Sequence, residues 1–289
     1  MRTIDLESLR IFKTVVDAGG VVRAASKLNR VQSNVTTRIR QLEEHLGARL
    51  FRREGRYLRL SAEGQSLVIY ANRLLRLADE AVSVMRTGKP KGVFRLGALE
   101  STAGSRLAPI LSRYHTLYPD VVVELATGTA GALVTRVINF ELEAAFVSEP
   151  FTAPALNARP VFEERLVLIT STEIGRVADP ADIGRSTLIA FAQGCSYRRR
   201  LEEWLGSANV MPERILEFAS YQAMIACVAA GTGFAVVPKS VLETLGAAKS
   251  VHQHPLPKRI AHNRTHIVWH GDPSPALTGL LSLVASAAA

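Results

Sequence analysis

The sequence predicts an α/β protein in three successive parts: a winged helix-turn-helix, a long linker helix and a pair of α/β lobes. Three patterns indicate this fold class. An amphipathic helical segment near the N-terminus precedes a basic hairpin, a heptad repeat of apolar residues follows the hairpin, and strand-like and helix-like runs alternate from Val93 onward. We expect the first two parts to span residues 1–60 and 61–91.

Charge is distributed unevenly along the 289 residues. Residues 1–91 hold 18 Lys and Arg against 9 Asp and Glu, whereas residues 92–289 hold 17 of each kind. The whole net charge of +9 therefore lies in the first third, which is typical of a polyanion-binding part joined to a part with another role. The arginines belong to a compact motif and not to a low-complexity tail or an amphipathic anchor, so nucleic acid is favoured over a membrane surface.

The segment from Gln32 to Leu46 has two different faces. Val35, Ile39 and Leu42 recur at helical spacing and predict a buried stripe. The opposite stripe carries amide, hydroxyl and guanidinium groups, which can read base edges in the major groove of double-stranded DNA. A basic hairpin follows as the wing. The candidate DNA-binding residues are Gln32, Ser33, Asn34, Thr36, Thr37, Arg38 and Gln41 in the helix and Arg52, Arg53 and Arg56 in the wing. A solvated helix and hairpin without a partner is the alternative.

A long helix is predicted from Ser61 to about Thr87, and Ser61 can cap its first turn. Apolar residues recur along this helix at heptad spacing and form a seam suited to pairing with a second helix. An ordinary core helix is the alternative, but no neighbouring strand or helix of the same chain is evident that would cover the band. A Gly- and Pro-containing stretch at 88–92 then marks a domain boundary. The candidate dimerisation residues are Leu67, Ala71, Leu74, Ala78, Ala81 and Met85.

The rest of the chain alternates strands and helices, which predicts parallel sheets flanked by helices in two small lobes. Helices are predicted near residues 107–114, 133–139 and 221–230. Strands are predicted at Val93–Ala98, Val121–Leu125, Ala144–Val147, Leu166–Ile169, Thr187–Phe191, Ile215–Phe218 and Phe234–Val237.

Polar residues gather where these strands end and helices begin. Ligands of open α/β sheets bind beyond the carboxyl ends of the strands, where helix N-termini point toward them. Each hydroxyl alone is equally well explained as a helix N-cap, and only their convergence favours a binding site. The candidate effector-binding residues are Glu100, Ser101, Thr102, Gly128, Thr129, Ser148, Glu149, Cys195, Ser196, Tyr197, Arg198 and Tyr221.

Two classes of ligand fit these residues. A carboxylate would suit the N–H groups at the starts of the helices, with Arg198 as its counter-charge. A cationic amine would instead use Glu100 and Glu149. The sequence does not choose between the two.

Six segments form an ordered set over sixty residues: Asp5–Phe12, Ala24–Leu28, Ile39–Glu43, Leu46–Gly47, Leu50–Arg53 and Leu60–Gly64. In these segments the first ninety residues resemble the DNA-binding module of LysR-type transcriptional regulators. The chain departs from the family's usual Ser-Gln-Pro-Ala in the recognition helix, where it has Val31-Gln32-Ser33-Asn34, so the bases read there can differ from the family norm. A closer resemblance, over most of the chain, is to a subgroup associated with regulating putrescine utilisation.

The resemblance implies an effector domain like a periplasmic binding protein, with a small-molecule effector in the cleft between its lobes. Residues 264–270 then return to the first lobe. Lobe I comprises residues 92–163 plus 264–289, and lobe II comprises residues 164–263. The family further implies that residues 61–91 pair two DNA-binding modules, that the protein is a dimer or homotetramer on promoter DNA, and that effector binding alters DNA bending and contact with RNA polymerase.

Motifs of enzymes are missing from the sequence. It has no Gly-x-Ser-x-Gly elbow, no His-Glu-x-x-His pattern and no P-loop, so neither an enzyme nor a cofactor is expected. The Gly231-Thr232-Gly233 run follows a predicted helix and is interpreted as a helix stop. No metal is expected, because the histidines lack ligand spacing: two lie beside prolines in a predicted loop and two lie on a predicted strand. These are His252, His254, His266 and His270.

Two alternative functions remain open. Cys195 and Cys227 allow a redox-responsive regulator, as in the family's peroxide-sensing members, although Cys227 suits a buried apolar position. An effector-independent structural DNA-binding protein is the other, and the two α/β lobes argue against it. No apolar run reaches the length of a membrane span and no signal-peptide pattern is present, so we expect a cytoplasmic protein.

Overall fold

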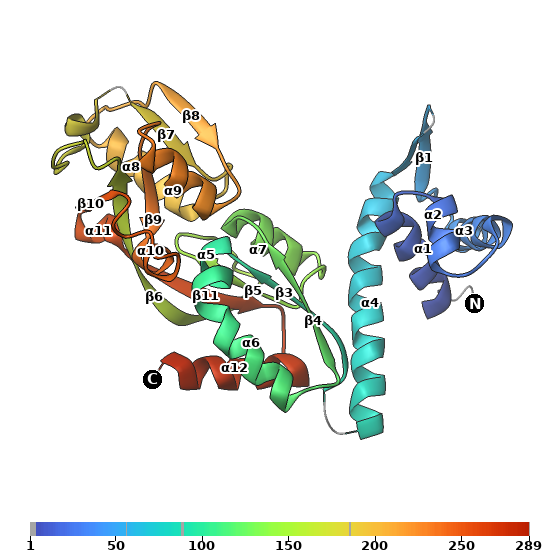
Figure 1. Cartoon of the computed structure of the whole chain (residues 1–289). Coiled ribbons are helices and arrows are strands. Elements are labelled where there is room, and N and C mark those ends of the chain that lie inside the picture. Colours follow the sequence, from blue (N-terminus) through green and yellow to red (C-terminus); the bar gives the residue numbers. More distant parts are fainter. Residues whose placement is uncertain (1–3, 56, 88–89, 185, 289) are drawn as a thin grey trace. The chain divides into compact units, whose positions relative to one another are not determined.

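Two compact units make up the chain in a computed structural model that describes residues 4–55, 57–87, 90–184 and 186–288 (Figure 1). Unit 1 is Met1–Lys89 with Asn139–Glu141, and unit 2 is Pro90–Ile138 with Leu142–Ala289. The predicted wing residue Arg56 lies outside the described residues.

Unit 1 is a group of short helices followed by a hairpin and one long helix. Asp5 begins the first helix by accepting the Ser8 N–H at 2.8 Å, and Gly19 ends it in the left-handed region with φ 65°. Ala24 and Val35 are completely buried in a core shared by the first three helices, as the helix-turn-helix prediction requires. The elements are α1 (Leu6–Ala18), α2 (Val21–Lys27), α3 (Gln32–Leu46), β1 (Phe51–Glu54), β2 (Tyr57–Leu60) and α4 (Ala62–Thr87).

Helix α4 is attached to the hairpin at its first turn. Ser61 Oγ accepts the Gly64 N–H at 2.9 Å and donates to the Arg49 carbonyl at 2.6 Å, which confirms the predicted cap. A Cβ on Gly64 would lie 2.1 Å from the carbonyl oxygen of Leu50, so only glycine permits this close approach.

The predicted apolar seam of α4 divides into an inner and an outer part. Leu67 and Ala71 are 9% and 0% exposed and pack in the core of unit 1, so the prediction that they pair with a second copy is wrong. Because a helix has 3.6 residues per turn, positions at heptad spacing rotate away from that core farther along. Leu74 and Met85 stay 42% and 82% exposed, Ala81 is exposed and Ala78 is half-buried. Other exposed large apolar residues in the described part of α4 are Ile69, Tyr70, Leu77 and Val82.

Unit 2 alternates strands and helices as predicted. Its strands are β3 (Gly92–Ala98), β4 (Val121–Thr127), β5 (Ala144–Ser148), β6 (Asn157–Thr170), β7 (Thr187–Ala190), β8 (Arg214–Glu217), β9 (Ala235–Pro238), β10 (His252–Pro255) and β11 (His262–Trp269). Its α-helices are α5 (Glu100–Thr102), α6 (Ala108–Leu117), α7 (Ala130–Ile138), α8 (Ser196–Gly206), α9 (Tyr221–Ala229), α10 (Lys239–Thr244), α11 (Lys258–Ala261) and α12 (Pro275–Ala288). A π-helix, η1 (Ala103–Leu107), joins α5 to α6, and a 3-10 helix, η2 (Pro180–Ile183), precedes β7.

One mixed sheet runs through unit 2 in the order β10-β6-β11-β5-β3-β4, with β9 also paired to β6. β3 is parallel to β4 and β5, while β11 is antiparallel to β5 and β6. β6 is longer than predicted: its first part pairs with β11, and its end pairs with β9 and β10. The predicted boundary between the lobes at residues 163 and 164 therefore falls inside a continuous strand.

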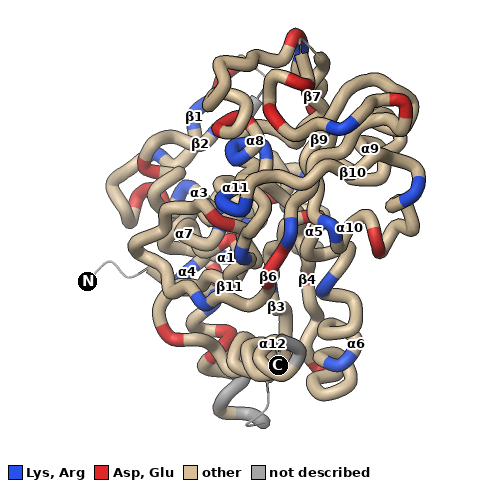
Figure 2. The backbone as a smooth tube through the Cα atoms, turned by 90° about the vertical axis from the view of Figure 1, so that its left-hand side faces the viewer, with Lys and Arg blue, Asp and Glu red and all other residues tan. Residues whose placement is uncertain are grey.

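Helices cover both faces of the sheet in lobe I. Ala144 and Phe146 of β5 pack with α6 and α12, whereas Ala145 and Val147 pack with α7, and all four are buried. The described part of α12 is tan in Figure 2, because this helix has neither basic nor acidic residues. None of the helices in the described ranges, α12 included, is long and apolar enough to cross a membrane.

Two histidines predicted to lie in a loop belong instead to strand β10, because pairing with β6 overrides the local proline signal. His254 is 1% exposed. Its Nδ1 accepts the Val177 N–H at 3.1 Å, so its Nε2 carries the proton and donates to Thr170 Oγ1 at 2.8 Å. Burial lowers the pKa of His254, and the neighbouring charge of His252 lowers it further.

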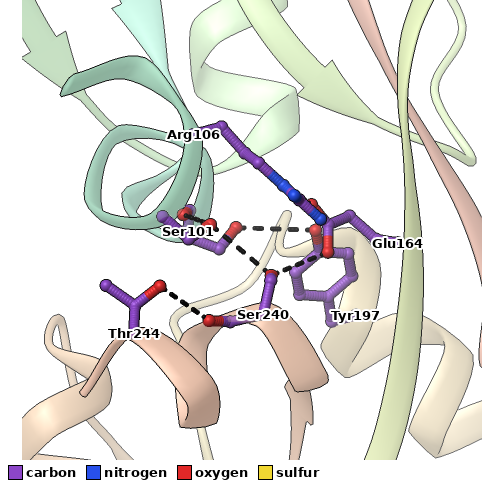
Figure 3. Close-up of polar contacts among 7 residues, drawn as sticks. Ser101, Arg106, Glu164, Tyr197, Ser240 and Thr244 are labelled. Atoms are coloured by element: carbon purple, nitrogen blue, oxygen red, sulfur yellow. Dashed lines mark hydrogen bonds and ion pairs between the residues drawn. The ribbon is translucent and has the colours of Figure 1, made fainter. Parts of the chain in front are cut away.

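A buried carboxylate ties the lobes together where β6 passes between them (Figure 3). Glu164 of β6 accepts a bond from Arg106 Nε at 2.8 Å and from Ser240 Oγ at 2.7 Å. Arg106 lies in η1 of lobe I and Ser240 in α10 of lobe II. Ser105 Oγ donates to the Ser101 carbonyl at 2.7 Å and lies 3.5 Å from Ser240 Oγ. The network therefore extends from the start of α5 to α10.

Protonation of His254 is expected to destabilise unit 2. Its pKa is lowered in the folded chain, so the unfolded chain binds this proton more tightly. The stabilisation is complete above the ordinary histidine pKa of 6.5 and is lost as the pH falls below it toward the folded-state pKa. Urea unfolding followed by tryptophan fluorescence at successive pH values measures it, because Trp204 and Trp269 both lie in unit 2. His254→Gln should flatten the pH dependence, whereas His252→Gln should keep most of it, because burial is the larger cause of the lowered pKa; an unchanged profile in His254→Gln contradicts the assignment.

Removing the cation of the Glu164 network should also destabilise unit 2. Arg106→Gln leaves a carboxylate that is 5% exposed without its counter-charge, and the free energy of unfolding should fall by about 2–3 kcal/mol. Arg113→Gln, an exposed change on α6, should stay within about 0.5 kcal/mol of wild type. Glu164→Gln should recover part of the loss in the Arg106→Gln background, because no buried charge remains. Equal stabilities of the Arg106→Gln and Arg113→Gln variants in the fluorescence assay would rule out a structural role for the pair.

Candidate DNA-binding face and effector cleft

Helix α3 presents a polar face opposite its buried stripe. Val35, Ile39 and Leu42 are buried in the core of unit 1, as predicted. Thr36 is half-buried, and its hydroxyl donates to the Gln32 carbonyl at 3.0 Å. The predicted base-reading side chains that are exposed are Gln32, Ser33, Asn34, Thr37 and Gln41.

Arg38, like Thr36, is less exposed than these five residues. Its side chain is 38% exposed, and its Nη2 lies 3.7 Å from Glu7 Oε2 on α1. The other oxygen of Glu7 lies 2.6 Å from Arg30 Nη2. One carboxylate therefore faces two arginines beside α3. Exposed ion pairs of this kind are weak, so a DNA group can replace Glu7.

The wing carries basic side chains on both of its faces. Arg52 and Arg59 are cross-strand partners, and both pair with Glu54, at 3.1 and 2.7 Å. Arg53 is exposed, and the alternation of a strand directs it to the other face.

Glu43 connects α3 to the wing, a role that was not predicted from the sequence. Glu43 is buried, and its carboxylate accepts the N–H groups of Leu50 at 2.8 Å and Phe51 at 3.3 Å. Arg49 supplies the counter-charge at 3.0 Å. The only sequence signal was an acidic residue next to Leu42 on the inner side of the helix. Glu43 sets where the wing begins relative to α3.

The predicted effector-binding residues of unit 2 lie at the ends of β3, β4 and β5 and at the starts of the helices that face them. Glu100–Thr102 form α5 after β3, Gly128 and Thr129 separate β4 from α7, and Ser148 ends β5. Cys195 precedes α8, which begins with Ser196, and Tyr221 begins α9. Those that are buried are Ser101, Thr102, Ser148, Cys195, Ser196, Tyr197, Arg198 and Tyr221.

Hydrogen bonds join the two lobes at these residues. Ser148 Oγ of lobe I accepts a bond from Ser196 Oγ of lobe II at 2.9 Å and another from Asn263 Nδ2. Ser101 Oγ lies 3.5 Å from the Tyr197 hydroxyl. A ligand that enters between the lobes must replace these bonds with its own.

Two buried polar atoms of this cluster have no hydrogen-bond partner within the described part of the chain. They are Asn263 Oδ1 and Thr265 Oγ1, on side chains 4% and 0% exposed. Thr265 is the cross-strand partner of Ser148, so both side chains lie on one face of the sheet. Unpaired buried polar atoms are rare and point to a bound ligand or water. Neither residue was predicted from the sequence, because the register of β11 decides which side chains lie beside them.

The arginine predicted to balance an effector carboxylate already has partners. Arg198 is 5% exposed and donates to Glu202 at 2.8 Å, to Glu217 at 2.6 Å and to the Phe191 carbonyl at 3.1 Å. Two carboxylates therefore neutralise its charge, and the predicted role as counter-charge is not supported.

The two acidic residues among the predicted effector-binding residues differ in their surroundings. Glu149 Oε1 lies 3.4 Å from His266 Nε2. Glu100 is half-buried; burial raises the pKa of its carboxyl, and the N–H of Tyr221 opposes this shift. Glu100 thus belongs to lobe I and contacts the first residue of α9 in lobe II.

Both cysteines are free thiols. Burial raises the pKa of Cys195, although the N–H groups of Arg198 and Tyr197 oppose the shift. A raised pKa keeps this thiol protonated, and the thiolate is the reactive form. The environment of Cys195 therefore disfavours reaction with oxidants.

Comparisons with known proteins identify both parts of the chain. The bacterial regulatory helix-turn-helix domain of the lysR family matches residues 6–65, and the LysR substrate binding domain matches residues 87–289. The HTH-type transcriptional regulator CzcR of Bacillus thuringiensis subsp. konkukian (strain 97-27) is 37% identical over 270 residues, covering 93% of this chain and 92% of that protein. GltR of Bacillus subtilis (strain 168) is 33% identical over 282 residues, covering 96% and 95%.

Solved structures agree on the fold. ArgP from Mycobacterium tuberculosis gives a TM-score of 0.74 at 18% identity, covering 99% of this chain and 98% of that one. Full-length CbnR complexed with its target DNA gives 0.68 at 21% identity, covering 99% and 100%. The narrower assignment to regulators of putrescine utilisation finds no support among these relatives. The chain belongs to the LysR family and is a DNA-binding transcriptional regulator with a substrate-binding domain, not an enzyme.

Proposed function

We propose that the chain reads promoter DNA with the outward face of α3 and the wing, and that a small polar effector binds between the lobes of unit 2. One observation carries the proposal for the effector. A buried cluster of hydroxyl and amide groups joins the lobes, and two of its polar atoms, Asn263 Oδ1 and Thr265 Oγ1, lack partners among the described residues.

The DNA-reading role rests on the chemistry of the exposed face. Amide side chains such as Asn34 and Gln41 match the hydrogen-bonding edge of adenine, and Arg38 matches guanine. Thr37, between Asn34 and Gln41 in α3, offers a hydroxyl and a methyl group. Arg53 of the wing suits contact with phosphate, which positions a protein on DNA without reading its sequence. Gln32, Ser33, Thr36, Arg52 and Arg56 complete the proposed interface.

The proposed effector role rests on the helix starts and polar residues where the two lobes meet. The N–H groups at the starts of α7, α8 and α9 suit a carboxylate that displaces their present partners, which include Cys195 and Glu100, while Glu100 and Glu149 suit an amine. With Arg198 already neutralised, a carboxylate would depend on those N–H groups and on the hydroxyls of Ser148 and Ser196. Both ligand classes bind through the same cluster.

Assembly is proposed to use the outer part of α4. Its exposed apolar residues recur four and three residues apart, which is the spacing of a helix pair. Pairing with a second copy would cover them, and a tetramer with contact to RNA polymerase would follow the family pattern. We further propose that the regulator acts in the cytoplasm, where the DNA is. The outer residues are Tyr70, Leu74, Leu77, Ala81, Val82 and Met85.

The alternatives receive less support. A redox-responsive regulator needs a reactive thiol, and the raised pKa of Cys195 opposes this. An effector-independent DNA-binding protein would leave the partnerless atoms of the cluster unexplained.

A charge on the outer part of α4 should break the dimer. Leu77→Glu places a carboxylate where a partner helix would bury it, so light scattering should show a smaller species and DNA affinity should fall. Gln65→Glu adds the same charge at an exposed position of the first part of α4 and should leave the assembly unchanged. If Leu77→Glu has the same mass as wild type, another surface makes the dimer.

The cluster should be required for effector binding. Thermal denaturation of the full chain with a set of small carboxylates, amines and polyols identifies ligands that raise the melting temperature. Ser148→Ala should weaken the best of them by about tenfold in calorimetry, because a buried polar group of the ligand loses its partner. Ser250→Ala, an exposed hydroxyl in lobe II, is the control. Equal affinity in both variants would place the ligand elsewhere.

A further inference from the structure

We propose that Glu7 of α1 limits sequence-independent DNA binding, because it holds Arg30 and Arg38 away from phosphates. The inference rests on the proposed DNA-reading role of α3 and goes beyond it: it assigns specificity to an acidic residue outside the recognition helix. Glu7 is a positioning residue, since it acts through the two arginines.

The positions of Glu7, Arg30 and Arg38 support the proposal. The two oxygens of the Glu7 carboxylate each face a different arginine, Arg30 at 2.6 Å and Arg38 at 3.7 Å. The three side chains are 50%, 34% and 38% exposed, so all of them can reach a DNA duplex. Glu7 therefore competes with DNA for both guanidinium groups.

The surroundings of Arg38 support the same role. Asp5, two residues before Glu7, caps α1 by accepting the N–H and hydroxyl of Ser8. Those bonds lower the pKa of the Asp5 carboxyl, and the positive charge of Arg38 lowers it further. Arg38 thus lies beside two carboxylates at the start of α1, while its neighbours on α3, Thr37 and Gln41, are exposed.

The physical consequence differs between specific and random DNA. A phosphate offers any free arginine a charge-assisted bond, whatever the base sequence. An arginine held by Glu7 must first give up its partner, so each random encounter is weakened. At a matching site Arg38 gains a bidentate contact to a base, which offsets the loss of its contact with Glu7. Glu7 thereby raises the ratio of specific to random binding.

The test compares Glu7→Gln with Asp17→Asn in the full chain. Asp17 is an exposed carboxylate on the same helix that pairs with Lys13 at 2.6 Å, so its replacement makes the same change in net charge away from Arg38. Two DNA probes are used: a random-sequence duplex, and the duplex that wild type enriches from a random pool. Affinities are measured over a series of KCl concentrations.

We expect Glu7→Gln to bind the random duplex about threefold more tightly, which is the effect of one exposed ion pair. Its salt dependence should steepen by up to about 0.9 in the logarithmic slope for each arginine released. The gain on the enriched duplex should be smaller, so the specificity ratio falls. Asp17→Asn should change both affinities by less and should keep the ratio.

Further variants identify the cause. In a background with Arg30→Gln and Arg38→Gln, the gain from Glu7→Gln should vanish; a gain that persists there, or an equal gain in Asp17→Asn, overturns the proposal. No gain in Glu7→Gln also overturns it. The proposed base-reading role of Arg38 has its own test: it is contradicted if the Arg38→Gln variant enriches the same DNA sequence as wild type. Thermal melts confirm that each variant is folded, as expected for changes of partly exposed side chains.

Discussion

Unit 2 depends on the pairing of β6 with β11, the two strands that run between its lobes. Both are inside the sheet, so polar side chains at the crossing must find partners within the protein. Glu164 takes one partner from each lobe, Arg106 and Ser240, and Asn263 binds Ser148. Apolar packing makes the core continuous across the lobes, but these polar bonds decide how the lobes meet. A ligand at the proposed site would exchange bonds of this second kind, which costs less than separating the apolar core.

Carboxylates organise the arginines of unit 1 in a similar way. Glu43, Glu54 and Glu7 each hold one or two arginines, and they differ in burial. Glu43 is buried and fixes the backbone of the wing, so its role is structural. The side chains of Glu7 and Glu54 are 50% and 47% exposed, so DNA bound at the proposed face can displace them. These three carboxylates hold Arg30, Arg38, Arg49, Arg52 and Arg59 in the absence of DNA, and replacing the exposed ones at the proposed DNA-binding face would cost little.

Particular residues show how far the sequence predicted the structure. The stripe of Val35, Ile39 and Leu42 and the cap at Ser61 are where periodicity and capping rules expect them. The seam of α4 was predicted only in part, because Leu67 and Ala71 turn toward the core of their own unit. Heptad spacing does not say which surface covers a helix. His254 illustrates the same limit, since only its pairing with β6 makes strand β10.

The sequence by itself determined the order of the elements, the basic and neutral parts and the ends of the strands where polar residues gather. These features follow from side-chain periodicity, turn residues and charge, which are local along the chain. Only the tertiary structure decided that Arg198 is neutralised by Glu202 and Glu217, that Asn263 and Thr265 join the cluster, and that Glu7 faces Arg30 and Arg38. Partners of this kind lie far apart in sequence, and strand register and helix packing bring them together.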